Sequence, residues 1–381
     1  MLLLTNARWL TLEYRKLKEF IDIKTGKLDA NANSKNGKYP FFTCSKDPLK
    51  IDTYSYDCEC VLLAGNGDLN VKYYKGKFDA YQRTYILECK NNVICTKYLY
   101  YFMQKYVETL RNQAIGGVIK YIKLSNINDA LMPIYNTNEQ GKIIKEISQV
   151  EEIINIRKKQ LIELDNIIKS QFVEMFGNPN KNEKRFKVEE LKNCIFNIEN
   201  GKSFICENFA RENDYPAILK LSAVTYGNFN QYENKALINR KMFIPKNEVH
   251  SRDLLFTRKN TPELVGMSAF VYETKPNLML PDIIFRINTL ECCNKIYLWQ
   301  MINHPLFRNK IKSISNGSAK SMSNISKEKL MNIKIILPPI ELQNQFADFV
   351  KQIDKQKFES VIKAKKEIEK IQKNIFYKWG R

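Results

Sequence analysis

The sequence predicts an α+β fold in which two globular domains are joined by two long helices, with the halves related as a pseudo-twofold internal repeat. Its main support is that identical or apolar residues recur at a constant offset of 203 positions: Gln140 and Gln343, Gln149 and Gln352, Ile147 and Val350, Val150 and Ile353, and Ile168 and Ile371. Long amphipathic runs carry this repeat, and mixed strand-and-turn patterns lie between them. Solenoids repeat about every 20–50 residues, so a repeat over half of the chain indicates a duplicated domain-plus-helix unit.

The first globular domain is expected over residues 1–138. Within it, an apolar run at 60–64 leads into a turn at 65–68, and further strand patterns cover 70–74 and 85–87. A short apolar run that ends at glycine and asparagine residues is typical of a strand entering a turn. The pattern therefore predicts a domain of mixed strands and helices.

The first long helix is expected over residues 139–178. Apolar residues recur along it at spacings of three, four and seven, which places them on one face of a helix. The run ends at Gly177, Asn178 and Pro179, and a glycine followed by a proline is typical of a helix C-terminus.

The second globular domain is expected over residues 179–340 and repeats the outline of the first with different residues. Strand patterns cover 253–257 and 282–287. Leu17 and Leu191 are counterparts at an offset of 174 rather than 203, so the second domain is 29 residues longer than the first. The helices are thus similar between the halves, whereas the globular parts have diverged.

The second long helix is expected over residues 341–381, after Pro338 and Pro339. Roughly 38 residues at 1.5 Å each give a rod of about 55 Å, and its apolar stripe needs a partner. We expect the two helices to form an antiparallel coiled coil. The alternative is two separate amphipathic helices, each packed on its own domain. Seven apolar residues are expected at the helix–helix or partner-subunit interface: Ile147, Val150, Leu161, Ile168, Val350, Ile353 and Ile371.

The composition points to nucleic acid as a partner. The chain has 61 Lys and Arg against 41 Asp and Glu, a formal charge of +20, together with 20 Tyr and 21 Phe. Basic side chains release counterions from a phosphate backbone, which favours binding to nucleic acid. The alternative is an ordinary basic protein from a proteome rich in Lys and Asn.

Cysteine and histidine usage argues against a metal site, and none is expected. Cys58 and Cys60 are two positions apart, Cys292 and Cys293 are adjacent, and the chain has two His. These spacings do not suit a structural zinc cage. The N-terminal Met-Leu-Leu-Leu-Thr is too short for a signal sequence, and no apolar run approaches 18 residues. A cytoplasmic protein is therefore expected.

The ordered alternation of divergent domains and repeated helices resembles the specificity (S) subunit of type I restriction–modification systems. The resemblance covers essentially the whole chain and rests on five stretches: 38–45, 61–67, 76–84, 254–266 and the Pro-Pro-Ile-Glu-Leu-Gln run at 338–343. The chain departs from the family at Thr137-Asn138-Glu139-Gln140, where a proline-rich approach to the helix is common.

The resemblance implies that each globular domain is a target-recognition domain reading one half of an asymmetric bipartite DNA site. It implies that the helices set the half-site spacing and bind two methyltransferase (M) subunits, and that restriction (R) subunits complete the complex. It further implies no cofactor in this chain, S-adenosylmethionine in the M subunits, and ATP and Mg in the R subunits. Readers separated by a rigid rod can reach major-groove faces about 34 Å apart.

Candidate DNA contacts are polar residues in or beside turns at strand ends. Arg and Lys pair with guanine, and Asn and Gln with adenine, in the major groove. The candidates are Asn66, Lys72, Tyr73, Gln82 and Arg83 in the first domain, and Lys220, Ser222, Arg258, Lys259 and Asn260 in the second. The alternative for each is a solvated surface side chain, and for Tyr73 a core position.

No catalytic residue is expected. The chain lacks a Walker loop, and Gly65-Asn66-Gly67 lacks the further glycine of a dinucleotide-binding turn. Three alternative functions stay open at this point. They are a specificity subunit for a fused methylase–nuclease, a stand-alone nuclease using Asp282 and Glu291, and a coiled-coil scaffold without a DNA role.

Overall fold

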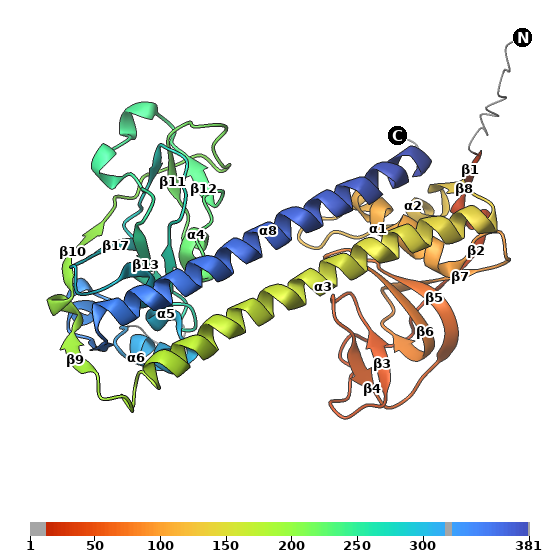
Figure 1. The fold of residues 1–381 in the computed structure, drawn as a ribbon. Coiled ribbons are helices and arrows are strands. Elements are labelled where there is room, and N and C mark those ends of the chain that lie inside the picture. Colours follow the sequence, from red (N-terminus) through yellow and green to blue (C-terminus); the bar gives the residue numbers. More distant parts are fainter. Residues whose placement is uncertain (1–12, 317–321, 380–381) are drawn as a thin grey trace, which may run out of the picture. The chain divides into compact units, whose positions relative to one another are not determined.

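A computed structural model describes residues 13–316 and 322–379. The expected start of the first domain at residue 1 and the expected end of the second long helix at residue 381 lie outside the described residues. The expected domain boundaries stay a prediction. By its internal contacts the chain divides into two compact units, which are described separately. Unit 1 comprises residues 1–156 and 363–381, and unit 2 comprises residues 157–362. Each unit therefore holds one globular part and portions of both long helices (Figure 1).

The globular part of unit 1 is built on a six-stranded sheet of order β2-β7-β5-β6-β3-β4. Its strands are β2 (Ile21–Thr25), β3 (Tyr39–Phe42), β4 (Leu49–Ile51), β5 (Tyr56–Ala64), β6 (Val71–Ala80) and β7 (Thr84–Cys89). Helix α1 (Thr96–Gln113) packs against β5 and β6. Val61 and Leu63 of β5 belong to the core beneath α1, whereas Cys60 and Leu62 belong to a second core on the other face. Burial on both faces explains why residues 60–64 read as an uninterrupted apolar run.

A two-stranded ladder connects this sheet domain to the first long helix. Strand β1 (Glu13–Lys16) pairs antiparallel with β8 (Leu131–Ile134). The remaining elements of unit 1 are the 3-10 helix η1 (Leu17–Glu19) and helix α2 (Leu124–Asn128). After β8 the chain enters α3 (Thr137–Phe176), a helix of 40 residues that continues into unit 2.

The globular part of unit 2 has a four-stranded sheet of order β10-β17-β13-β15 and a three-stranded sheet of order β12-β11-β16. Pairs β14–β18 and β9–β19 complete its strands. The strands are β9 (Lys187–Glu190), β10 (Ile195–Asn200), β11 (Ala217–Leu219), β12 (Asn234–Ala236), β13 (Leu254–Thr257), β14 (Lys259–Asn260), β15 (Ser268–Phe270), β16 (Leu278–Met279), β17 (Ile284–Thr289), β18 (Ser323–Asn324) and β19 (Lys334–Leu337).

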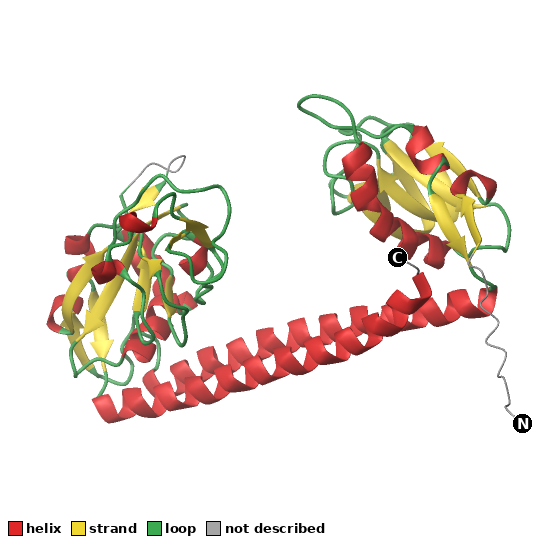
Figure 2. Cartoon of the chain, turned by 90° about the horizontal axis from the view of Figure 1, so that it is seen from above, coloured by secondary structure: helices red, strands yellow, loops and turns green. Residues whose placement is uncertain are grey.

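The helices of unit 2 are η2 (Leu191–Asn193), α4 (Ser222–Thr225), η3 (Arg240–Met242), η4 (Pro245–Asn247), α5 (Lys295–Asn303), α6 (Pro305–Ser313), α7 (Lys327–Met331) and the start of α8 (Ile340–Trp379). They lie on both faces of its four-stranded sheet: Tyr297 of α5 shares a core with Leu254 of β13, whereas Val224 of α4 shares a second core with Leu255. In Figure 2 these helices are red and the strands yellow. The predicted α+β class and the two-part organisation are confirmed.

The same frame of contacts recurs in both globular parts. Lys16 pairs with Leu131 in the first ladder, and Glu190 pairs with Lys334 in the second. In unit 1 the backbone nitrogen of Leu17, which follows β1, donates to the carbonyl oxygen of Ala130, which precedes β8, at 3.0 Å. In unit 2 the nitrogen of Leu191, which follows β9, donates to the carbonyl oxygen of Ile333, which precedes β19, at 2.9 Å. Both α3 and α8 have 40 residues and begin 203 positions apart. The repeat seen in the sequence is therefore a repeat of backbone contacts.

The ends of the long helices follow local chemistry. Helix α3 begins at Thr137, two residues before the expected start, because the side chain of Asn136 accepts a hydrogen bond from Glu139 N at 2.9 Å. It ends at Phe176, and Gly177 then takes a left-handed conformation with φ of 72°. The helix thus ends two residues before the expected bound of 178, at the Gly177-Asn178-Pro179 stretch that was expected to stop it.

Within unit 2, the second half of α3 and the first half of α8 run antiparallel. Lys357 Nζ donates to Asp165 Oδ1 at 2.6 Å, and Ser360 Oγ donates to Gln160 Oε1 at 3.0 Å. The Phe346 ring lies 5.3 Å from that of Phe176. From one contact to the next the residue numbers rise along α8 and fall along α3, so the two helices run in opposite directions.

These same helix segments also pack on the globular part of unit 2. Phe172 stacks on Tyr297 of α5 at 5.9 Å and on His304 at 4.9 Å. In unit 2 the helix segments therefore pack both on each other and on the globular part, so the two arrangements considered from the sequence are not exclusive. Of the seven expected interface residues, Ile168, Val350 and Ile353 are buried and the other four half-buried: Ile147, Val150, Leu161 and Ile371.

Candidate nucleic-acid interface

In unit 1, the two turns that carry Asn66 and Arg83 meet the loop that follows β3. Gly65 N, beside Asn66 in the β5–β6 turn, donates to the carbonyl oxygen of Arg83 in the β6–β7 turn at 2.8 Å. The Cys44 thiol, which follows β3, donates to the same oxygen at 3.6 Å. The Asn70 amide donates to Cys44 O at 2.8 Å. The turns that hold Asn66 and Arg83 are thus joined by backbone contacts.

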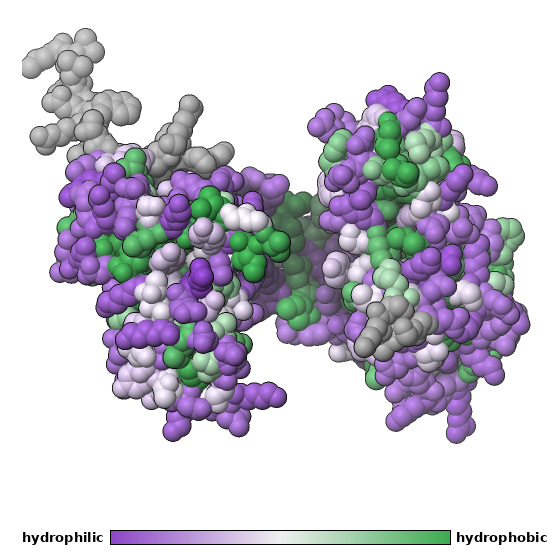
Figure 3. Space-filling model, turned by 180° about the vertical axis from the view of Figure 1, so that it is seen from behind, coloured by the Kyte–Doolittle hydropathy of each residue, from purple (hydrophilic) through white to green (hydrophobic). Residues whose placement is uncertain are grey.

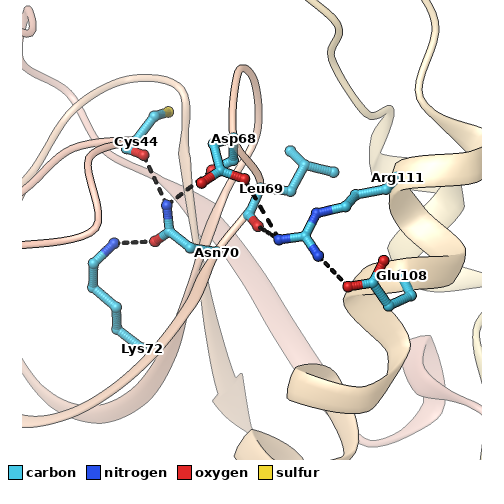
Figure 4. A network of polar contacts seen from close by, with 7 residues as sticks. All are labelled: Cys44, Asp68, Leu69, Asn70, Lys72, Glu108 and Arg111. Carbon is cyan, nitrogen blue, oxygen red and sulfur yellow. Dashed lines mark hydrogen bonds and ion pairs between the residues drawn. The ribbon is translucent and has the colours of Figure 1, made fainter. Parts of the chain in front are cut away.

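Lys72 belongs to this network. Its ammonium group donates to Asn70 Oδ1, and the Asn70 amide also donates to Asp68 O at 2.9 Å (Figure 4). Burial lowers the pKa of Lys72 from its ordinary value. Lys72 is therefore a partly desolvated cation held at the base of the β5–β6 turn.

Helix α1 fixes this turn from the other side. Arg111 donates through Nη2 to Leu69 O at 2.6 Å and lies 3.5 Å from Asp68 Oδ1, and it also contacts Glu108 (Figure 4). Sequence reasoning missed Asn70 and Arg111. Asn70 could have been found because it opens the strand pattern directly after a predicted turn, whereas no sequence signal pairs Arg111 with a turn some 40 residues earlier.

Tyr73 and Gln82 are not part of the network. The Tyr73 hydroxyl donates to Glu59 Oε1 at 2.9 Å, and its ring lies 6.0 Å from Tyr100 of α1. Successive side chains of a strand point to opposite faces, so Tyr73 faces the helix while Lys72 faces away. Burial and the Glu59 hydrogen bond raise the pKa of Tyr73 to about 12. Gln82 is exposed and donates to Asp29 Oδ1 at 3.3 Å.

In unit 2, Arg258 and Lys259 lie at the short β14–β18 pairing. Arg258 Nε donates to Asn324 Oδ1 of β18 at 3.2 Å. Its guanidinium lies 5.3 Å from the centre of the Phe285 ring, and Lys327 Nζ of α7 lies 5.8 Å from the same ring. The aromatic face stabilises both cations. Three basic residues therefore gather around one strand pair.

Asn260 joins this pair to the rest of the candidates. Its amide nitrogen donates to Thr225 Oγ1 of α4 at 3.0 Å, and its oxygen accepts from Thr261 N at 2.9 Å. The residue is 5% exposed, so its side chain presents little surface to a ligand. Tyr226, directly after α4, is 74% exposed; sequence reasoning passed over it.

Lys220 and Ser222 meet at one carboxylate beside α4. Ser222 Oγ donates to Glu233 Oε2 at 2.6 Å, and Lys220 Nζ lies 3.5 Å from the same oxygen. The Ser222 hydrogen bond and the Lys220 charge lower the pKa of Glu233. Because α4 also carries Thr225, the five candidates of the second domain gather around α4 and β14.

The arrangement in both units can position hydrogen-bond donors for phosphates and base edges. Arginine, lysine and amide side chains are the groups that serve this purpose in DNA complexes. In the view of Figure 3 the surface is largely hydrophilic, with small hydrophobic patches. In the described ranges 13–316 and 322–379, no group of three or more His, Cys, Asp or Glu could hold a metal ion. Nor is any described helix long and apolar enough to cross a bilayer.

The geometry disfavours the nuclease alternative. Asp282 precedes β17 and contacts Ser203, whereas Glu291 follows β17 and lines a cavity of about 1090 Å³ that Asp282 does not line. A strand rises about 3.3 Å per residue, so the six residues of β17 separate the two carboxylates by roughly 20 Å. Two carboxylates this far apart cannot share one metal ion.

Comparison with known proteins gives matches across both halves. The sequence profile described as "Type I restriction modification DNA specificity domain" matches residues 10–166 and again residues 183–370. The Type I restriction enzyme EcoDI specificity subunit of Escherichia coli is 37% identical over 161 residues, which is 42% of this chain and 35% of that protein. This chain therefore spans about a third of the length of that relative.

Two further matches extend over most of the chain. The Type I restriction enzyme MjaVIII specificity subunit of Methanocaldococcus jannaschii is 24% identical over 341 residues, covering 83% of this chain and 76% of that protein. The fold is similar to the crystal structure of a type I restriction–modification S subunit from M. genitalium. That similarity covers 98% of each chain, with a TM-score of 0.56 and 16% identity.

Proposed function

Because the chain belongs to the family of type I restriction–modification DNA specificity proteins, we propose that it is the DNA-recognition subunit of such a complex. Each globular part reads one half of an asymmetric, bipartite DNA site. The chain itself carries out no chemistry and directs partner subunits to the site. The stand-alone nuclease and the scaffold without a DNA role are set aside.

One observation carries the proposal: the same set of strand ladders and helix starts supports two globular parts whose candidate DNA-binding loops differ. The β1–β8 and β9–β19 ladders and the starts of α3 and α8 repeat contact for contact. The candidate loops do not repeat, since unit 1 presents Asn66, Lys72 and Arg83 where unit 2 presents Arg258 and Lys259. A similar frame with dissimilar readers suits recognition of two unlike half-sites.

The long helices are assigned the spacing role. In the proposed assembly α3 and α8 pair as an antiparallel coiled coil along their length, and the halves are related by a pseudo-twofold axis. Support comes from the antiparallel contacts within unit 2, such as Lys357 with Asp165, and from the equal length of the helices. Two similar helix surfaces would give two identical partner subunits equivalent binding surfaces.

The proposed partners are double-stranded DNA, two methyltransferase subunits and restriction subunits. In this assignment S-adenosylmethionine is bound by the methyltransferase subunits, and ATP and Mg by the restriction subunits. The similarity to type I restriction enzyme specificity subunits supports this type of complex. The residues proposed at or beside the DNA are Asn66, Lys72, Gln82, Arg83, Lys220, Ser222, Arg258 and Lys259. Tyr226 and Lys327 are added to them. Tyr73 and Asn260 are assigned to supporting the fold.

Single-molecule methylation sequencing tests the proposal. DNA from cells that express this chain with its methyltransferase partner should carry an asymmetric methylated motif of two parts with a fixed gap. The motif should vanish when this gene is deleted. An active methyltransferase partner whose methylation pattern is the same with and without this chain would contradict the recognition role.

A further inference from the structure

The glutamine that recurs at positions 140 and 343 is buried in both halves, so it is not a candidate DNA contact. Gln140 is the fourth residue of α3 and is 1% exposed. Its amide nitrogen donates to Val93 O at 2.6 Å and to Tyr135 O at 2.7 Å, and its amide oxygen accepts from Cys95 N at 3.0 Å. Val93 and Cys95 lie in the β7–α1 connection, while Tyr135 lies between β8 and α3.

Gln343 makes the same three bonds in unit 2. It is the fourth residue of α8 and is 0% exposed. The nitrogen donates to Cys292 O at 3.1 Å and to Pro338 O at 2.7 Å, and the oxygen accepts from Asn294 N at 2.9 Å. Cys292 and Asn294 lie in the β17–α5 connection, and Pro338 lies between β19 and α8.

Each glutamine therefore ties three chain segments together at the root of a long helix. All of its partners are backbone groups, so the bonds do not depend on which residues form the loops. A primary amide offers two N–H donors and an acceptor oxygen, and the two donors and the oxygen are used in both copies. We call Gln140 and Gln343, with these bonds, the glutamine clamps.

A tyrosine reinforces each clamp. The Tyr98 hydroxyl of α1 donates to Pro133 O at 2.9 Å, and the Tyr297 hydroxyl of α5 donates to Ile336 O at 2.9 Å. Pro133 and Ile336 occupy the same position in the strands that precede α3 and α8. The helix that covers each sheet is thus linked to the segment from which a long helix begins.

The repeat itself contains a contrasting pair. Gln149 and Gln352 are also identical at the offset of 203, yet both are exposed. Identity at this offset does not by itself indicate a shared contact, whereas the buried pair shares all three bonds. Gln149 and Gln352 are therefore matched controls on the same two helices.

We propose that the glutamine clamps are positioning residues that fix the angle between each globular part and its long helix, and thereby the length of the gap accepted between DNA half-sites. This inference rests on the proposed DNA-recognition function. A helix of 40 residues is about 60 Å long. A tilt of about 3° at its root moves its far end by roughly 3 Å, close to the 3.4 Å rise of one base pair. Small angular freedom at the clamp is therefore enough to admit a wrong gap length.

The test replaces each clamp glutamine by an apolar side chain of the same length. Gln140→Met and Gln343→Met keep the side-chain length and remove the hydrogen bonds; Gln149→Met and Gln352→Met are the controls. Each variant is expressed with the methyltransferase partner in cells that carry a plasmid library. The library fixes both half-sites found by methylation sequencing and varies the gap from two base pairs shorter to two longer.

The wild-type complex and the controls should methylate one gap length at least tenfold more than its neighbours. For either clamp variant this preference should fall to roughly threefold or less, while discrimination against single-base changes within each half-site stays at the wild-type level. A role confined to stability would lower methylation at every gap length equally and leave the preference intact.

Three results would overturn the proposal. They are an unchanged gap preference, a parallel loss of gap preference and half-site discrimination, and a folded complex that methylates no gap length. If the Met variants do not fold, Tyr98→Phe and Tyr297→Phe, which remove one hydroxyl each, decide in the same assay. Failure of the recognition function itself would look different, because the wild-type complex would then give no two-part motif.

Discussion

Arg258 is a proposed DNA contact of unit 2 whose side chain is held in place by its neighbours. It is half-exposed beside Lys259 and is oriented by Asn324 and the Phe285 ring. Arg258→Ala should weaken binding of the complex to its cognate site by about 1–3 kcal/mol, because one arginine–base contact has that value. Titration of duplex DNA into the purified complex measures this change.

Lys181→Ala is the matched control, since Lys181 is exposed in the connection between α3 and β9. Its effect should stay within about 0.5 kcal/mol, as for most surface changes. Equal affinities of the Arg258→Ala and Lys181→Ala complexes would remove Arg258 from the interface.

His304 gives a pH dependence at the scale of one residue. Its Nδ1 accepts from Leu306 N at 3.4 Å, and its ring stacks on Phe172. Burial lowers the pKa of His304 below its ordinary value of 6.5. The unfolded chain then binds more protons than the folded chain, so the free energy of unfolding should fall as pH drops below 6.5.

Thermal melting of the purified chain between pH 7.5 and about 5 tests this expectation. His304→Asn, which keeps a capping oxygen, should show a weaker pH dependence than the wild-type chain. His250→Asn changes the other histidine, which is exposed, and should behave as the wild type. The role of His304 would be refuted by identical pH profiles for the two variants.

Single residues also show where sequence reasoning reaches its limit. The candidates Asn66, Lys72 and Arg83 were predicted from turn position, and the structure brings them together. Tyr73 and Asn260 have equally suitable side chains, but one faces α1 and the other bonds to α4. Strand face and burial depend on distant elements, which residue type alone does not report.

At the scale of elements, the paired segments of α3 and α8 depend on a cluster of aromatic side chains. Phe346 of α8 is buried against Phe172 and Phe176. Phe346→Ala should lower the free energy of unfolding by about 3–5 kcal/mol, because it leaves a cavity in a packed core. Urea denaturation of the purified chain provides the measurement.

Phe358 lies on the same helix and is 65% exposed. Phe358→Ala should therefore change the free energy of unfolding by no more than about 0.5 kcal/mol. A loss as large as that of Phe346→Ala would mean that burial in this helix pair does not govern stability.

Helices and strands differed in how far the sequence predicted them. The long helices were predicted closely because a spacing of three and four persists over many turns. Strand β5 was predicted from its apolar run, whereas β14 and β18, each of two residues, leave no periodicity to read. Their pairing depends on Lys259 meeting Asn324 across 65 positions of chain.

For the whole molecule, the formal charge of +20 implies strong dependence of DNA binding on salt. The logarithm of the binding constant should fall linearly with the logarithm of salt concentration, because each neutralised phosphate releases counterions. Lys259→Ala should make that slope shallower by about one, if Lys259 contacts a phosphate. Binding isotherms at three or more salt concentrations give the slope.

The Lys181→Ala complex is again the control and should keep the wild-type slope. Binding that is insensitive to salt for the wild-type complex would be inconsistent with a phosphate-contacting surface on either unit.

The two ladders also constrain how the chain is made. Strands β1 and β9 share one register, so each could in principle pair with the partner of the other. Synthesis separates them in time: β9 begins 53 residues after β8 ends (187 − 134), so it leaves the ribosome about 3–11 s later at 5–20 residues per second. The first ladder can therefore close before β9 exists. Order of synthesis, rather than a difference in sequence, would keep the duplicated halves from exchanging strands.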